Sequence, residues 1–338
     1  MNSKLAYVGF AFKHHLNTHA GYHQIEKYLP YDEIFDLQRF HFRNTCRTNI
    51  VIRAIRRIIR FIFGFNVIPW FVMDLAHYGR KNPNTVFHFI YGENSLNNIK
   101  PLLNSNNKIV CTLHQPYEWF ERNPRFIKLI KCIDSVILVS NAEIDKFAAL
   151  IGKDRVHYIP HGICADFYKP NPSVPKEHML LTVGDWLRDY KFANKVYQEL
   201  LAVDPELQIN IVSLPKNKSY IMPHKRIHFF CGISDEELRS LYCRCSVLFL
   251  PLIRFTANNA LLEAAATGCT IVISSNNFDN SYIPENFITQ SCMDVTETVK
   301  KIQESISTNY NQSLADYVKD HYSWNEVANQ TFNLLSNL

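Results

Sequence analysis

The chain has 338 residues, of which 47% are hydrophobic and 20% are charged, and its formal net charge is +5. A chain of this length exceeds the size at which one hydrophobic core keeps growing, so the sequence predicts two folded domains. The composition excludes a disordered or low-complexity protein. The small charge, without a zinc-finger or RNA-binding motif, argues against nucleic acid as a partner.

The N-terminal residues do not resemble an export signal, because their apolar stretch is short and lacks a small-residue cleavage site. No window of about 20 apolar residues occurs in the sequence. The nine cysteines are scattered and fit neither a disulfide framework nor a paired zinc site. We therefore expect a cytoplasmic protein with reduced thiols.

Short apolar runs alternate with helical patterns along the chain, which is typical of parallel sheets crossed by helices. In the first half, the predicted strands are residues 5–10, 86–90, 109–113, 135–139 and 156–159. The first strand is followed by a long loop and by a helix that begins after Gly21. Residues 1–162 are predicted to form a Rossmann-like domain.

An arginine-rich segment begins at Arg39 and ends at Arg60. It holds seven arginines and no acidic residue. On a helix, the arginines of its second half share a narrow arc opposite isoleucines and a valine. Such a helix either lies on an anionic membrane surface or packs its apolar face on its own domain. The first alternative implies a lipid-linked or membrane-proximal ligand. The arginines could instead recognise the pyrophosphate group of such a ligand.

The second series of predicted strands comprises residues 179–183, 208–212, 227–230, 247–250 and 270–273, with helices at residues 235–243 and 258–267. Proline cannot sit inside a central strand, so the proline-rich stretch before this series marks the domain junction. Its prolines are Pro160, Pro170, Pro172 and Pro175. Residues 163–320 are predicted to form a second Rossmann-like domain, and residues 321–338 a helix that packs back toward the first.

The clearest local signal is TANNALLEAAATGCTIVIS, residues 256–274. Asn258 and Asn259 are N-cap candidates for a helix, and Gly268 follows where that helix would stop. The start of the helix offers N–H groups to phosphate or sugar oxygens. Glu263 lies in the second turn, where a buried carboxylate needs a partner such as two ribose hydroxyls. The alternative is an ordinary solvent-facing glutamate.

This stretch, together with LLTVGDWLRDYK, ISDEELRSLY and VHYIPHGICADFYKP, resembles glycosyltransferase family 4, the retaining enzymes of the GT-B fold. The likeness covers the second half from Ser135 onward and extends more loosely over the first half. It implies an α/β protein with two doubly wound domains facing across a cleft. It also implies a nucleoside-diphosphate sugar as the donor substrate, without a resident cofactor.

In that family, a helix carries two glutamates separated by seven residues, and the second binds the ribose of the donor. Glu263 matches the second glutamate, and Phe255 stands where the first glutamate would hold the donor sugar. A phenylalanine cannot accept a hydrogen bond from a hydroxyl group. The sugar contacts are therefore expected from Thr256, Asn258, Asn259 and nearby backbone N–H groups.

The family also places an arginine after the glycine that corresponds to Gly184, and a lysine seven residues beyond it, both on the donor diphosphate. Lys191 matches the lysine, whereas Asp185 stands at the arginine position and Arg188 lies in the same loop. A leaving nucleoside diphosphate gathers negative charge, which two fixed cations can stabilise without a metal. The sequence contains no Asp-X-Asp triplet for a metal. The alternative is that these are exposed loop charges.

Two residues of the first half complete the predicted site. His114 follows an apolar strand and lies at the carboxyl edge of a parallel sheet, where open sheets bind ligands. The resemblance places it near the donor sugar, and the alternative is a satisfied structural histidine. The resemblance also places Gly21 in a loop whose backbone approaches the sugar nucleotide or the acceptor.

The sequence thus predicts a retaining, metal-independent glycosyltransferase that moves a hexose-like sugar to the hydroxyl group of a glycan or lipid-linked acceptor. Polysaccharide or lipopolysaccharide assembly is the expected setting, with peripheral attachment to the inner face of the membrane. One alternative, favoured by Phe255, is a catalytically silent partner subunit that binds a nucleotide sugar or glycan. A dinucleotide-dependent oxidoreductase is a further alternative, but no G-x-G-x-x-G motif follows a strand.

Overall fold

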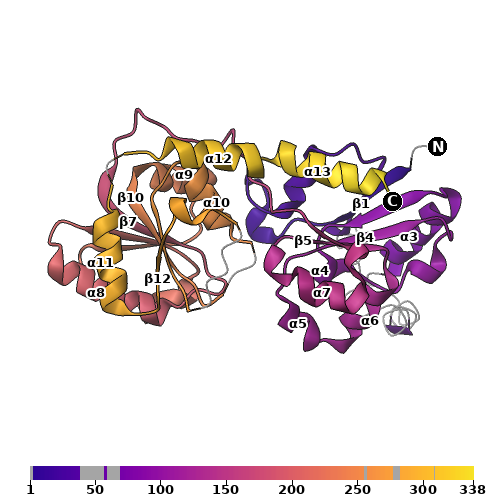
Figure 1. Ribbon diagram of the computed structural model, residues 1–338, viewed down its shortest axis with the longest axis horizontal. Helices are drawn as coiled ribbons and strands as arrows, with labels where there is room; N and C mark the ends of the chain where they lie inside the picture. Colours follow the sequence, from indigo (N-terminus) through magenta and orange to yellow (C-terminus); the bar gives the residue numbers. More distant parts are fainter. Residues whose placement is uncertain (1–2, 39–56, 59–68, 255–256, 277–281, 308) are drawn as a thin grey trace, which may run out of the picture. The chain divides into compact units, whose positions relative to one another are not determined.

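The computed structural model describes residues 3–38, 57–58, 69–254, 257–276, 282–307 and 309–338. The described residues divide into two compact units (Figure 1). The first unit comprises Met1–Leu16, Gly21–Gly162 and Trp324–Leu338, and the second comprises Asn17–Ala20 and Ile163–Ser323. The second unit therefore consists of two separate segments of the chain, and the first of them has only four residues.

The first unit contains a six-stranded parallel sheet with the order β2-β1-β3-β4-β5-β6. The strands are β1 (Lys4–Gly9), β2 (Glu33–Asp36), β3 (Thr85–Phe89), β4 (Lys108–Leu113), β5 (Ser135–Leu138) and β6 (Val156–Tyr158). The helices are α3 (Pro69–Lys81), α4 (Gly92–Ser95), α5 (Tyr117–Glu121), α6 (Pro124–Cys132) and α7 (Ile144–Ile151). The strands read as apolar runs because a parallel sheet is covered on both faces.

The second unit contains a six-stranded parallel sheet with the order β12-β11-β10-β7-β8-β9. The strands are β7 (Glu177–Val183), β8 (Gln208–Val212), β9 (Ile227–Phe230), β10 (Cys245–Pro251), β11 (Ile271–Ser274) and β12 (Thr289–Ser291). The helices are α8 (Tyr190–Val203), α9 (Asp235–Arg244), α10 (Asn259–Ala266), α11 (Val295–Ser305) and α12 (Gln312–Tyr322). Helices α8 and α11 cover one face of the sheet, and α9, α10 and α12 cover the other (Figure 1).

All ten predicted strands are present, and their ends agree with the structure to within two residues. The sequence analysis missed β2 and β12, which lie at the outer edges of their sheets. Both are short, with the sequences EIFD and TQS. An edge strand pairs on one side only, so neither sequence needs the continuous apolar run by which the other strands were recognised.

Two predicted helices differ from the observed ones. The helix expected after Gly21 is a 3-10 helix, η2 (Tyr22–Lys27). The helix expected over residues 321–338 begins at Trp324 and is α13 (Trp324–Ser336), because Ser323 separates it from α12. The carbonyl group of Tyr322 accepts a hydrogen bond from the backbone N–H of Ile163, which fixes this break in the helix.

The four-residue segment Asn17–Ala20 belongs to the second unit, although the sequence analysis assigned all of residues 1–162 to the first domain. The His19 ring stacks on Phe167 with 3.7 Å between the ring centroids. Its Nδ1 atom also lies 2.9 Å from Oδ2 of Asp235. These two contacts hold the segment on the second unit, and no local sequence pattern predicts them.

The arginine-rich segment lies outside the described residues except for residues 57 and 58, which are helical and exposed. Within the described ranges, no helix combines the length and the apolar character needed to cross a membrane. The predicted membrane-surface helix therefore stays a prediction.

Helix α13 is anchored on the first unit by Trp324, whose side chain is buried. Its indole ring lies 5.5 Å from the ring of Tyr22 and 5.4 Å from that of His161. Gly162 lies directly against the indole, and a Cβ atom built at this glycine would come within 2.3 Å of it. The position therefore requires a residue without a side chain.

We expect Trp324→Ala to lower the free energy of unfolding by about 3–5 kcal/mol, because it leaves a cavity between α13 and η2. Phe332→Ala on the same helix is the matched control, since the Phe332 side chain is 39% exposed and its loss is expected to cost much less. Denaturant unfolding followed by circular dichroism compares the two variants. Equal losses of stability would contradict the anchoring role of Trp324.

Candidate functional site

The loops that follow β7, β8 and β10 are joined to one another at the carboxyl edge of the second sheet. The Gly184 N–H donates to the Val212 carbonyl group at 3.0 Å, and the Ser213 hydroxyl donates to the Gly184 carbonyl group at 2.8 Å. The Ile253 N–H donates to the Leu187 carbonyl group at 3.0 Å. The stretch VGDWLRDYK is thereby fixed at the edge where open parallel sheets bind ligands.

Gly184 allows the Arg188 side chain to lie close to the backbone of this loop. Its φ angle is +108°, a conformation that favours glycine. A Cβ atom at this position would lie 2.9 Å from Nη2 of Arg188. The glycine therefore lets the guanidinium group lie against the backbone of the loop.

Arg188 connects the loop after β7 to the start of α10. Its Nη2 donates to Oδ1 of Asn258 at 2.9 Å, and its Nη1 donates to the Trp186 carbonyl group at 2.9 Å. The same Asn258 oxygen accepts a hydrogen bond from the Leu261 N–H and so caps the helix, as predicted. Burial lowers the pKa of Arg188 from its usual value. Two residues predicted separately for the donor site are thus in direct contact.

Lys191 lies in the first turn of α8 and is exposed. Its Nζ atom lies 5.7 Å from the centre of the Tyr220 ring, within reach of a cation–π interaction. Lys191 is therefore a solvated cation close to the same sheet edge, whereas Arg188 is held by neutral oxygen acceptors.

Asp185 stands where the family resemblance led us to expect an arginine, and its charge is compensated locally. Its Oδ2 lies 3.0 Å from Nζ of Lys216, and its Oδ1 accepts a hydrogen bond from Asn217 at 2.6 Å. Lys216 follows β8 and was missed in the sequence analysis. Lys216 could have been identified because it follows β8, the strand next to β7 in the sheet.

Glu263 is buried and 4% exposed, so the solvent-facing alternative is wrong. Its Oε2 accepts a hydrogen bond of 2.9 Å from the Tyr242 hydroxyl on α9. Burial raises the pKa of Glu263 to about 7; the Tyr242 hydrogen bond opposes this rise, and the charge of Asp235 adds to it. The neutral phenols of Tyr242 and Tyr168 thus partly stabilise the carboxylate, and no ion pair to it is found among the described residues.

The start of α10 is described only in part. Asn259 is its first residue and is partly buried. Phe255 and Thr256 lie outside the described residues, so the predicted rebuilding of the sugar contacts around them stays a prediction.

His114 follows β4 at the carboxyl edge of the first sheet, as predicted, and its side chain is 14% exposed. The rings of Tyr22 and Tyr91 lie 4.9 and 4.8 Å from its own ring. Its Nδ1 atom lies 3.3 Å from Oε1 of Glu93, a buried residue that the sequence analysis missed. Glu93 follows β3, the neighbour of β4 in the sheet, and this position is the signal that identifies it.

Gly21 precedes η2 with a φ angle of +92°. A Cβ atom at this position would come within 2.4 Å of Nδ1 of His15. The same neighbourhood holds His23, whose pKa is lowered to about 4 mainly by burial and further by the charge of Lys27. Glycine is required here for packing within the first unit, and its predicted approach to a ligand stays a prediction.

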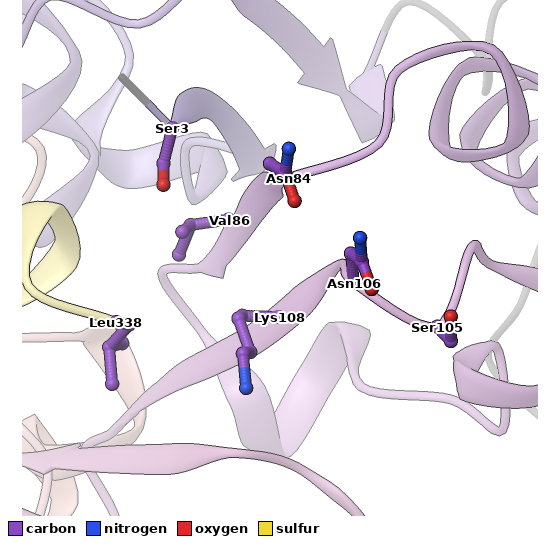
Figure 2. A pocket seen from close by; sticks show the side chains of 7 residues that line it. All are labelled: Ser3, Asn84, Val86, Ser105, Asn106, Lys108 and Leu338. Carbon is purple, nitrogen blue, oxygen red and sulfur yellow. The ribbon is translucent and has the colours of Figure 1, made fainter. Parts of the chain in front are cut away.

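A surface hollow of about 550 Å³ lies elsewhere on the first unit (Figure 2). It opens at the amino ends of β1, β3 and β4, the edge of the sheet opposite to His114. Open parallel sheets bind ligands at the carboxyl edge, so this hollow is not the candidate site. Its lining residues are Ser3, Asn84, Val86, Ser105, Asn106, Lys108 and Leu338.

No protein-family model matches the sequence. A curated relative, the phosphatidylinositol N-acetylglucosaminyltransferase gpi3 subunit of Schizosaccharomyces pombe, is 22% identical over 222 residues. The match covers 59% of this chain and 48% of the relative, so the chain spans about half the length of the curated relative that it matches.

Solved structures of glycosyltransferases are similar over nearly the whole chain. Anabaena Alr3699/HepE in complex with UDP and glucose has a TM-score of 0.68 at 14% identity, over 99% of this chain and 100% of that chain. The lipopolysaccharide outer core galactosyltransferase WaaB in its apo form has a TM-score of 0.65 at 13% identity, with the same coverage. Together with the two parallel six-stranded sheets, these likenesses show the two-domain α/β GT-B fold.

The burial of Glu263 predicts a stability difference that depends on pH. Because its folded pKa of about 7 lies above the usual value near 4.5, its contribution to stability is full below pH 4.5 and is lost as pH rises through 7. We expect Glu263→Gln to match the wild type in stability at pH 5 and to exceed it at pH 8 by up to about 3 kcal/mol.

Urea unfolding at the two pH values measures this difference, and Glu236→Gln is the control because Glu236 is exposed on the adjacent helix α9. If Glu263→Gln raises the free energy of unfolding equally at pH 5 and pH 8, the buried charge is not the cause of the stabilisation.

Proposed function

We propose that this chain is a retaining glycosyltransferase of family 4 that moves a sugar from a nucleoside-diphosphate sugar to an acceptor hydroxyl group. The observation that carries the proposal is the contact between Arg188 and Asn258, which joins two loops that the sequence assigned separately to the donor. The GT-B fold of the chain supports it, because the similar solved structures are glycosyltransferases.

The diphosphate of the donor is assigned to the start of α10 and to the cations around it. The first N–H groups of a helix have no partner within the helix and carry a partial positive charge, which suits a phosphate. Arg188 lies at this helix start through its bond to Asn258, and Lys191 adds positive charge at the same sheet edge. Fixed positive charges stabilise the leaving nucleoside diphosphate as the glycosidic bond breaks. We expect no metal in this role.

The ribose of the donor is assigned to Glu263. Its carboxylate is buried and receives hydrogen bonds from Tyr242 and Tyr168, and a carboxylate has about four lone-pair sites, so it keeps acceptor capacity for ribose hydroxyl groups. Hydrogen bonds to the charged form of a carboxyl group lower its pKa. Donor binding is therefore expected to draw Glu263 toward its ionised form.

The transfer step itself involves the donor, the acceptor and few protein groups. In the proposed front-face reaction, the acceptor oxygen forms the new bond to the anomeric carbon as the bond to the diphosphate breaks. The departing phosphate oxygen takes the proton of the acceptor hydroxyl group. His114 of the first unit lines the sugar site in this proposal. The acceptor is a glycan or a lipid-linked sugar bound by the first unit.

The cellular setting is proposed from the similar proteins and from the arginine-rich segment. WaaB is named as a lipopolysaccharide galactosyltransferase, and the gpi3 subunit as part of a phosphatidylinositol N-acetylglucosaminyltransferase. Both names point to lipid-linked acceptors. We propose assembly of a cell-surface glycan at the cytoplasmic face of a membrane, with the segment between Arg39 and Arg60 on the anionic lipid surface.

A second candidate function is a catalytically silent partner subunit that binds a nucleotide sugar. Phe255 favours it because this residue stands where the family has a glutamate for the donor sugar. The curated relative is likewise named as a subunit. In this candidate, the nucleotide contacts of Arg188, Lys191 and Glu263 remain, and only the transfer is absent.

Calorimetry with UDP, UDP-glucose, UDP-galactose, UDP-N-acetylglucosamine and GDP-mannose tests donor binding. We expect one sugar nucleotide to bind, and Lys191→Ala to weaken it about tenfold or more, because a hydrogen bond to a charged group is lost. Lys195→Ala is the matched control, since Lys195 is exposed one turn further along α8. No binding to any of these nucleotides would contradict both candidate functions, and binding without hydrolysis or transfer would favour the silent subunit.

A further inference from the structure

Glu93 is a buried carboxylic acid at the carboxyl edge of the first sheet, and its side chain is 4% exposed. It lies in the short helix α4 that follows β3, and β3 pairs with β4, the strand that leads to His114. Burying a carboxylate without a partner is costly. The groups that contact Glu93 therefore indicate its role.

Both oxygens of the Glu93 carboxyl group face His114. Oε1 lies 3.3 Å from the ring atom Nδ1, and Oε2 accepts a hydrogen bond of 3.4 Å from the backbone N–H of the same histidine. One carboxyl group thus contacts the ring and the main chain of a single residue, which restrains both the position and the rotation of the imidazole.

Aromatic neighbours restrict the His114 ring further. Tyr22 meets it edge-on at an interplanar angle of 75°, and Tyr91 lies at 42°. These two tyrosines are themselves joined, because the Tyr91 hydroxyl accepts a hydrogen bond of 2.9 Å from the Tyr22 N–H. The ring is therefore held by packing, and the carboxyl group lies beside one of its two nitrogens.

We propose that Glu93 is a positioning residue that keeps the hydrogen of His114 on Nδ1. A neutral imidazole with its hydrogen on Nδ1 has its lone pair on Nε2, so Nε2 is a hydrogen-bond acceptor. A carboxylate on the opposite nitrogen is a common way to fix this tautomer. Under the proposed function, the lone pair of Nε2 is suited to a hydroxyl group of the donor sugar. This last step rests on the proposed function, whereas the tautomer does not.

Nuclear magnetic resonance of the full chain with ¹⁵N-labelled histidine tests the tautomer directly, without any substrate. The His114 ring signals are assigned by their absence in His114→Gln. We expect a hydrogen on Nδ1 in the wild type, and a shift of the population toward Nε2–H in Glu93→Gln and Glu93→Leu. A wild-type ring with its hydrogen on Nε2, or ring signals unchanged in both variants, would overturn the proposal.

Glu143→Gln is the matched control for these spectra. Glu143 is also buried and lies in the same unit, but its Oε2 accepts a hydrogen bond from the Tyr117 N–H. The control variant is expected to leave the His114 signals in place. The isosteric Glu93→Gln keeps the comparison possible if Glu93→Leu does not fold.

Transfer kinetics test the step that rests on the proposed function. We expect Glu93→Gln to lower kcat about tenfold with little change in the KM of the donor, and to have no further effect in the His114→Gln background. Independent, additive effects of the two substitutions would overturn the action of Glu93 through His114. A wild type without transfer activity would contradict the proposed function alone, and the tautomer would still be decided by the spectra.

Discussion

The hydrogen bond from Arg188 to Asn258 is the contact on which the candidate donor site depends. It joins the loop after β7 to the first turn of α10, and Gly184 leaves room for the guanidinium group beside the backbone. The same Asn258 oxygen caps α10, so one side chain fixes the helix start and the arginine together. The N–H groups of the helix and the nearby cations consequently act on one small region of the sheet edge.

Glu263 shows that a preformed binding site can lower the stability of the folded protein. Its burial raises its pKa to about 7, which means that the folded protein holds a carboxyl group in surroundings that disfavour its charge. A more stable protein would carry a neutral side chain here. Under the proposed function, the hydroxyl groups of a bound ligand stabilise this charge, which would be the usual relation between functional residues and stability.

Much of the fold was predictable because it depends on continuous apolar runs, such as those of β4 and β7. The short edge strands β2 and β12 have no such run. The site residues that follow a strand or cap a helix were also predictable, as for His114 and Asn258. Glu93 and Lys216 were not recognised, because their partners lie 21 and 31 residues away in the sequence and only strand pairing brings them together.

The two units each hold a buried glutamate at the carboxyl edge of the sheet, and their surroundings differ in kind. Glu263 is bonded to a tyrosine hydroxyl, a neutral donor that leaves the carboxyl group to exchange protons near neutral pH. Glu93 lies beside an imidazole nitrogen and accepts a hydrogen bond from the backbone N–H of the same residue. The first arrangement suits a group that binds ligand itself. The second suits a group that orients a neighbour, so the surroundings of the two carboxyl groups favour different roles.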